Sequence, residues 1–245
     1  MDRMLYIAMT GAKQTLLAQA ANTNNLANAS TTAFRADFEA FRAMPVYGDG
    51  YPSRVYAMAE RPGVDLKSGT VVSTGRELDV AVSGEGWIAV QAADGSEAYT
   101  RAGDLRFSSN GLLTTGTGLA VLGNGGPIAV PPAEKIEIGV DGTISARGLG
   151  QAPNTLSAVD RIRLVNPPKG DLVKGKDGLL RLRNGEPAAV DENVRLVSGS
   201  LESSNVNAVE AMVSLITLSR QFEMQVKAMR ASEDIDQSAA QILRM

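Results

Sequence analysis

The stretch that decides the fold of the middle region is Leu78-Asp79-Val80-Ala81-Val82-Ser83-Gly84-Glu85-Gly86-Trp87-Ile88-Ala89-Val90. Apolar and polar side chains alternate up to Ser83, and a period of two is typical of a half-buried strand. The two glycines after Ser83 mark a turn, and a second apolar run starts at Trp87. We therefore expect two short strands here.

Further turn signals follow this stretch along the chain. Aspartate–glycine and asparagine–glycine pairs close tight hairpins because both residues tolerate positive φ. Four such pairs separate short apolar runs that continue to about Val197: Asp94-Gly95, Asn110-Gly111, Asp141-Gly142 and Asp177-Gly178. We predict an antiparallel β domain over residues 76–197.

Both ends of the chain have a helical period instead. Near the N-terminus, apolar and small residues recur at steps of three and four, at Met9, Ala12, Leu16, Ala20, Thr23 and Ala27. Near the C-terminus, the same period gives a stripe through Val209, Met212, Ile216, Phe222, Val226 and Met229, and Asn207 is placed to cap the helix. We predict helices over 1–32 and 198–245 that pair with each other in a coiled-coil-like axial part. The fold class is then α+β, with several regions.

Residues 33–75 are predicted to connect the first helix to the β domain. Phe34, Phe38 and Phe41 lie at i, i+4 and i+7, which predicts a short second helix. Prolines and glycines between Met44 and Gly69 predict an irregular or extended segment.

The composition excludes several classes of function. There is no cysteine and no histidine, so thiolate metal sites, disulfides and histidine-based catalysis are ruled out. The net charge of −3 disfavours nucleic-acid binding, and no apolar run approaches the ~20 residues that a membrane span needs. Asp2 and Lys13-Gln14 argue against a cleaved signal peptide. We expect no cofactor, no metal and no membrane insertion.

Two patterns in the sequence are similar to sites that carry chemistry in other proteins, and neither predicts such a site here. Gly170 to Lys176 meets most of the phosphate-loop pattern, but Asp177 stands where a serine or threonine is required, and a strand-like run follows. The carboxylate pairs Glu134/Glu137 and Asp79/Glu85 could serve a glycosidase, although alternate carboxylates on strands usually face solvent. We predict no catalytic residue.

Asparagines gather beside both helices, at Asn24, Asn25, Asn28, Asn205 and Asn207. One interpretation is capping and turn formation, to which asparagine is suited. The other is hydrogen bonding to another chain segment that fixes the register, because asparagine inside a helix costs helix propensity. The residues alone leave both open.

At these asparagines the sequence resembles the bacterial flagellar rod and hook axial proteins. The blocks that carry the resemblance are Asn24 to Phe34, Ser198 to Val209, Leu78 to Val82, Gly84 to Trp87, Tyr99 to Gly103 and Gly126 to Pro131. They cover essentially the whole chain. One departure is Ala33, where the family usually has glycine, and it would carry a cost if the position requires a positive φ.

The resemblance implies a structural subunit of the basal-body rod that transmits torque and is not an enzyme. Length and connector favour a proximal-rod subunit over a distal-rod subunit; a wall-remodelling glycosidase is the alternative from another class. The expected partners are other proximal-rod subunits, the distal-rod protein, copies of itself and the flagellar type III export apparatus, with the periplasmic basal body as location. The residues we predict at the assembly interface are Leu16, Asn24, Asn25, Leu26, Asn28, Phe34, Leu201, Glu202, Asn205, Asn207, Met212, Ile216, Phe222 and Val226.

Overall fold

The computed structural model describes residues 4–45, 55–152 and 155–242, and it divides the chain into two compact units. The helical unit is formed from the described parts of Met1–Ala29, Asp37–Gly63 and Val206–Met245. The β unit is formed from Ser30–Ala36 and the described parts of Val64–Asn205. The chain therefore enters the β unit twice, at Ser30 after the first helix and again at Val64, and it leaves after Ala36 and after Asn205.

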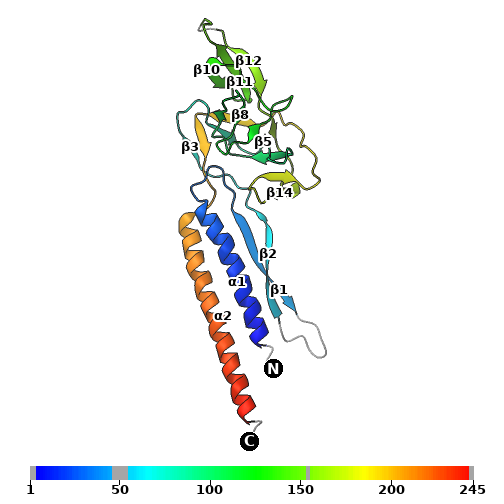
Figure 1. Ribbon diagram of the computed structural model, residues 1–245, viewed down its shortest axis with the longest axis vertical. Coiled ribbons are helices and arrows are strands. Elements are labelled where there is room, and N and C mark those ends of the chain that lie inside the picture. The colour runs from blue at the N-terminus through cyan, green and yellow to red at the C-terminus, as the bar shows by residue number, and fades with distance from the viewer. Residues whose placement is uncertain (1–3, 46–54, 153–154, 243–245) are drawn as a thin grey trace. The chain divides into compact units, whose positions relative to one another are not determined.

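The helical unit contains helices α1 (Met4–Ala27) and α2 (Ala208–Ile242), which contact each other and run antiparallel (Figure 1). It also contains a two-stranded sheet of β1 (Asp37–Pro45) and β2 (Val55–Val64), and β1 contacts α1. The two helices predicted from periodicity are present.

The short helix predicted from Phe34, Phe38 and Phe41 is wrong, because β1 occupies this stretch. Three aromatic residues over two helical turns fit a strand equally well by propensity, and pairing with β2 satisfies the backbone hydrogen bonds. The segment predicted to be irregular or extended contains the strand β2, which agrees with its extended alternative. At the other end, residues 200–202 form a strand, and the last helix begins only at Ala208.

The β unit is built from short strands in antiparallel pairs. Its largest sheet has the order β14-β15-β6-β5-β9-β8-β7, with β13 also paired to β5; three-stranded β10-β11-β12 and the pairs β16-β4 and β17-β3 complete the unit. The bounds are β3 Val71–Ser73, β4 Val80–Ser83, β5 Trp87–Gln91, β6 Glu97–Thr100, β7 Arg106–Phe107, β8 Leu113–Thr114, β9 Ala120–Val121, β10 Ala133–Ile138, β11 Thr143–Gly148, β12 Ser157–Arg161, β13 Leu164–Val165, β14 Leu172–Lys174, β15 Leu180–Leu182, β16 Arg195–Ser198 and β17 Ser200–Glu202; a 3₁₀ turn spans Lys169–Asp171.

All four predicted turn dipeptides close hairpins. They join β5 to β6, β7 to β8, β10 to β11 and β14 to β15, and each of these pairs is antiparallel. The glycine in each has a positive φ: Gly95, Gly111, Gly142 and Gly178. The phosphate-loop-like run thus ends in the β14–β15 hairpin and no helix follows it.

Strand β5 lies at the centre of the core because both of its faces are buried. Ile88 and Val90 point into the larger apolar cluster, with Leu113, Ile128 and Leu164 among its members. On the other face, Trp87 and Ala89 pack in a second cluster with Tyr99, Val165, Leu180 and Ala188. The stretch from Leu78 to Val90, which contains most of β5, therefore supplies the middle of the hydrophobic core.

Candidate assembly surfaces and junction cluster

The buried face of α1 consists of small residues. They are Ala8, Ala12, Thr15, Ala18 and Ala21, and the buried residues of α2 are Ala211 and Ser232. A Cβ added at Gly11 would lie 2.9 Å from the Gln225 side chain, so the helices approach closely there. Small side chains permit such a close approach between helix axes.

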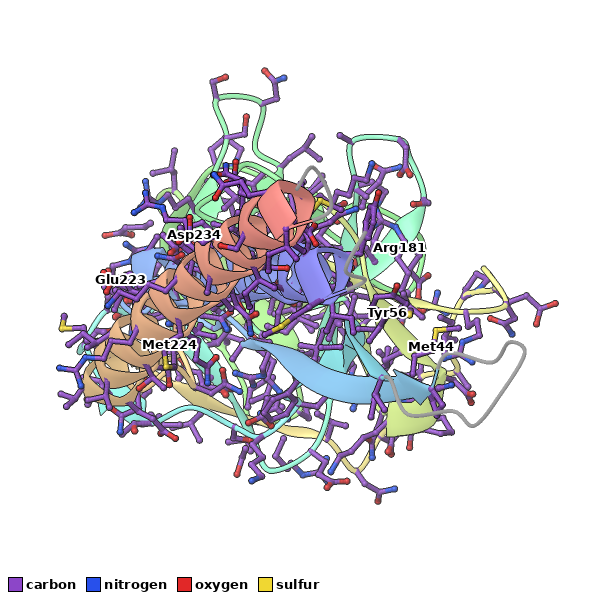
Figure 2. The ribbon with its side chains drawn as sticks, turned by 90° about the horizontal axis from the view of Figure 1, so that it is seen from below. Met44, Tyr56, Arg181, Glu223, Met224 and Asp234 are labelled. Carbon is purple, nitrogen blue, oxygen red and sulfur yellow. The ribbon has the colours of Figure 1, made fainter. Side chains whose placement is uncertain are left out.

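The large apolar side chains of the helices are mostly exposed. Leu16 on α1 is 49% exposed, and Met212 and Ile216 on α2 are 53% and 52% exposed. Met224, labelled in Figure 2, is also exposed. The same holds for Met4, Leu5, Tyr6, Met9, Leu17, Val209, Val213, Ile235 and Ile242. A contiguous run of large apolar side chains in water marks a surface that binds another molecule.

The predicted interface residues differ in their accessibility. Besides Leu16, Met212 and Ile216, the exposed members are Asn24 and Asn207; Asn25, Leu26, Asn28, Phe34, Leu201, Asn205, Phe222 and Val226 are half-buried, and Glu202 is fully buried. Glu202 therefore faces groups of its own chain.

Three asparagines of the cluster form hydrogen bonds to nearby backbone groups. Asn25 forms two hydrogen bonds of 3.0 Å with the backbone of Asp37, donating from Nδ2 to its carbonyl and accepting its N–H at Oδ1. Asn28 donates from Nδ2 to the carbonyl of Asn24. Asn207 caps α2, since its Oδ1 accepts the backbone N–H groups of Val209 and Glu210 at 3.1 and 3.3 Å. The predicted cap at Asn207 is confirmed.

A further asparagine joins the two helices directly. The Nδ2 of Asn22 donates to the carbonyl oxygen of Ala211 at 2.7 Å. Asn205, in the β unit, accepts the N–H of Ala36 at 2.9 Å and donates to the carbonyls of Asp65 and Lys67 at 2.9 and 3.2 Å. These bonds connect segments far apart in the sequence but within one chain.

The most constrained group in the β unit is a buried cluster around Glu202, which we call the junction cluster: Arg35, Trp87, Arg101 and Glu202. Oε1 of Glu202 lies 2.5 Å from Arg35 Nη2 and accepts the N–H of Gly69 at 2.7 Å, and Oε2 lies 3.1 Å from Arg101 Nη1. The guanidinium carbons of Arg35 and Arg101 lie 5.5 and 4.9 Å from the centroid of the Trp87 ring. Two cations thus share one carboxylate and one aromatic face.

Arg101 forms more hydrogen bonds than Arg35. Arg101 also donates from Nε to the carbonyl of Gly86 at 2.9 Å and from Nη2 to that of Gly84 at 2.6 Å. Arg35 has buried Nε and Nη1 atoms without a hydrogen-bond partner in the described part of the chain. Burial lowers the pKa of the Arg35 guanidinium, and the neighbouring Glu202 carboxylate opposes that shift.

Sequence reasoning did not identify Arg35 and Arg101 as members of this cluster. A charged residue that alternates with apolar neighbours is read as solvent-facing, as Leu201-Glu202 would be. A buried ion pair leaves the same pattern when its partner is distant in sequence, and here Arg35 and Glu202 are 167 residues apart. The sequence shows the single tryptophan, but it does not show that Arg35 and Arg101 lie over its ring.

The carboxylates considered for hydrolysis are held in ion pairs. Glu137 pairs with Lys135 at 2.5 Å and Glu85 with Lys169 at 2.5 Å, and both pairs are exposed. Asp79 is buried but pairs with Arg76 at 3.2 Å and accepts a hydrogen bond from Thr74 Oγ1 at 2.7 Å. Each of these three carboxylates thus lies beside a cation of its own chain.

Within the described ranges, no group of three or more histidine, cysteine, aspartate or glutamate side chains is arranged to hold a metal ion. No helix of the described chain is long and apolar enough to cross a membrane.

Known proteins similar to this chain fall into one family. Residues 197–242 match the family described as flagellar basal body rod FlgEFG protein C-terminal, and residues 81–146 match the flagellar hook protein FlgE/F/G D1 domain. The flagellar basal-body rod proteins FlgF of Escherichia coli and Salmonella typhimurium are 45% and 44% identical to it, over 100% of both chains in each case. FlgG of Bacillus subtilis is 31% identical, again over 100% of both chains.

These matches confirm the resemblance inferred from the terminal asparagine blocks and the middle strands. The identity to the two FlgF proteins exceeds that to FlgG by more than ten percentage points at the same coverage. The chain belongs to the FlgF family of flagellar basal-body rod proteins, which are structural rod subunits and not enzymes.

Proposed function

We propose that this chain is a proximal-rod subunit whose terminal helices pack against those of neighbouring subunits and so transmit torque through the periplasm. The observation that carries the proposal is the division of side chains between the two faces of the helices. Small residues fill the buried face of α1, while large apolar residues such as Leu16, Met212 and Ile216 are exposed.

Burial of these exposed side chains is the driving force we assign to assembly. Fully burying an exposed leucine- or isoleucine-sized side chain contributes about 1.5–3 kcal/mol, and covering the part of these side chains that is still exposed contributes about half of that. Several such side chains per subunit supply a large apolar contact, and interdigitated side chains resist shear in a way that exposed ion pairs do not. Coiled-coil-like pairing of the two terminal helices of the chain is part of this proposal.

The half-buried apolar residues of the predicted interface lie between the buried and the exposed faces of the helices. Phe222 and Val226 lie on α2 at the border between buried and exposed faces, as Leu26 does on α1. Asn24, exposed at the end of α1, is free to meet a polar group of a neighbour. The other asparagines hold their own chain in shape, as their hydrogen bonds indicate.

The partners we propose are copies of this chain, other proximal-rod subunits and the distal-rod protein FlgG. The flagellar type III export apparatus would deliver the subunit, and its place would be the periplasmic part of the basal body. The family membership supports these assignments.

The test is a substitution on the exposed face of α2 in a strain that depends on this gene for motility. Ile216→Asp places a charge in the proposed apolar contact, where an unpaired charge is strongly unfavourable, so we expect swimming to be lost. Ile216→Leu keeps the apolar side chain and should swim. Ser214→Asp adds the same charge to an exposed position about 200° around the helix and should swim as well.

Fluorescence of Trp87, which lies in the β unit, serves to show that the purified Ile216→Asp protein still folds there. Wild-type swimming of the Ile216→Asp strain would refute the packing proposal. Loss of swimming in the Ser214→Asp strain would show that charge on any face is harmful and would refute the assignment of this face.

A further inference from the structure

Residues 33–36 lie in the β unit as an extended segment whose backbone is bonded on several sides. These contacts come from segments distant in sequence, which are the connector after β2, the strand β14 and the stretch before α2. The bonds are Ala33 N–H to Glu202 O at 2.8 Å, Asn205 N–H to Phe34 O at 3.2 Å, Ala36 N–H to Asn205 Oδ1 at 2.9 Å, Asp65 N–H to Ala36 O at 2.8 Å and Lys174 Nζ to Arg35 O at 2.7 Å. The segment is therefore bound much as a short peptide is bound in a groove.

One side chain anchors the segment. Arg35 is buried, pairs with Glu202 and lies over Trp87. The ammonium of Lys174 lies 4.2 Å from the centroid of the Phe34 ring, which holds the neighbouring side chain against β14.

Three costs oppose this docking. Ala33 has φ 57°, the only positive φ among the non-glycine residues that the structure describes, and a side chain in the left-handed region is strained. Arg35 loses water at Nε and Nη1 without gaining a partner there, and buried donors left unpaired are costly. Ordering the backbone of four residues adds an entropy cost.

The remainder of the junction cluster does not depend on this segment. Glu202 also pairs with Arg101 and accepts the N–H of Gly69, and neither contact involves Arg35. Arg101 keeps the carbonyls of Gly84 and Gly86. Residues 33–36 can therefore leave without exposing an unpaired carboxylate.

We propose that residues 33–36 form a latch that is close to energetic balance in the free subunit and that closes when the terminal helices fold. The trigger rests on the proposed assembly of the subunit, in which the terminal helices fold as they pack against those of neighbours, because neither helix buries its large apolar side chains within the single chain. The latch itself does not, because its balance follows from contacts and costs within the β unit.

Chain connectivity gives the coupling. Asp37 follows Ala36 directly, and Asn25 of α1 holds both backbone groups of Asp37. When α1 is folded, residue 37 is already fixed, so closing the latch orders fewer free residues. A latch of this kind would bring the β unit into its final form only as the helices pack.

Hydrogen exchange on the full-length purified subunit tests the proposal. In the wild type, we expect the N–H groups of Asp65 and Asn205 to exchange much faster than that of Ala89, which bonds Arg163 O within the core sheet. Ala33→Gly removes the left-handed strain and should slow exchange at both amides by about fivefold. Ala36→Gly adds flexibility where φ is not positive, so it should speed exchange at the same amides.

A second variant separates the latch from the core. Arg35→Ala should abolish the remaining protection of Asp65 and Asn205 while leaving that of Ala89 unchanged. Equal loss of protection at Ala89 would show that Arg35 belongs to the global fold and would overturn the latch. Wild-type exchange of Asp65 and Asn205 at the same rate as Ala89 would overturn it too. Neither result depends on motility, so a failure of the latch is distinct from a failure of the rod assignment.

Discussion

Glu202→Gln should destabilise the β unit more than any surface carboxylate substitution. The carboxylate has no exposed area and accepts three hydrogen bonds, from Arg35, Arg101 and the N–H of Gly69. Glutamine keeps one acceptor oxygen and replaces the other with a donor. That donor then faces a guanidinium that needs an acceptor.

The magnitude follows from the loss of the negative charge between two buried cations. Breaking a buried ion pair by removing one partner costs about 3–5 kcal/mol, because the other charge is left uncompensated. Arg101 retains its two backbone carbonyls, and Arg35 can return to water with residues 33–36, so we take the lower end, about 3 kcal/mol. With a urea m-value of about 2 kcal/mol/M, the unfolding midpoint should fall by about 1.5 M.

Trp87 provides the assay because it is the chain's single tryptophan and lies against the cluster. Urea unfolding followed by its fluorescence therefore reports on the β unit. Glu85→Gln is the matched control, since Glu85 also forms an ion pair at 2.5 Å but its side chain is 65% exposed. We expect no measurable change for the control. A midpoint for Glu202→Gln within about 0.3 M of the wild type would refute the reasoning, given the m-value above.

Two further predictions concern the same unit. Gly69→Ala should lower the urea midpoint, because a Cβ there would lie 2.1 Å from Ser203 O and would push the Gly69 N–H away from Glu202; an unchanged midpoint would contradict this close approach. Burial raises the pKa of Tyr99 to about 12, above its ordinary value of 10.0, so the stability it contributes is complete below pH 10 and is lost as the pH rises towards 12. Urea midpoints across this range should fall in the wild type and fall less steeply in Tyr99→Phe; parallel slopes would exclude Tyr99 as the source.

The features that could be predicted from the sequence are those determined by local chemistry. The turn at Asp141-Gly142 depends on two adjacent residues and a positive φ, and such information is contained in the dipeptide itself. The cap at Asn207 is likewise local. Strand β1 is not determined locally. Phe38 lies in a sheet only because β2 pairs with β1, and no local pattern in the sequence predicts that pairing.

Helix packing shows a different limit of periodicity. The period in α1 predicted a helix, but a helix that carries both small and large apolar residues has two candidate faces. Ala12 lies on the buried face, whereas Leu16, which the pattern placed on the same stripe, is exposed. Hydrophobicity alone favours burial of the larger residue within the chain. Close packing against α2 instead favours the smaller residue on the buried face. The larger residue stays exposed and is available for a contact outside the subunit.

The segments beside the two terminal helices contribute residues to the junction cluster of the β unit. The sequence places residues 33–36 in the connector and residues 202–205 in the C-terminal axial helix, yet both segments belong to the β unit. Their hydrogen bonds to each other bring together the segment that follows α1 and the segment that precedes α2. Strain at Ala33 and incomplete pairing at Arg35 oppose the docking of residues 33–36, whereas residue 202 is also held by Arg101 and by the pairing of β17 with β3.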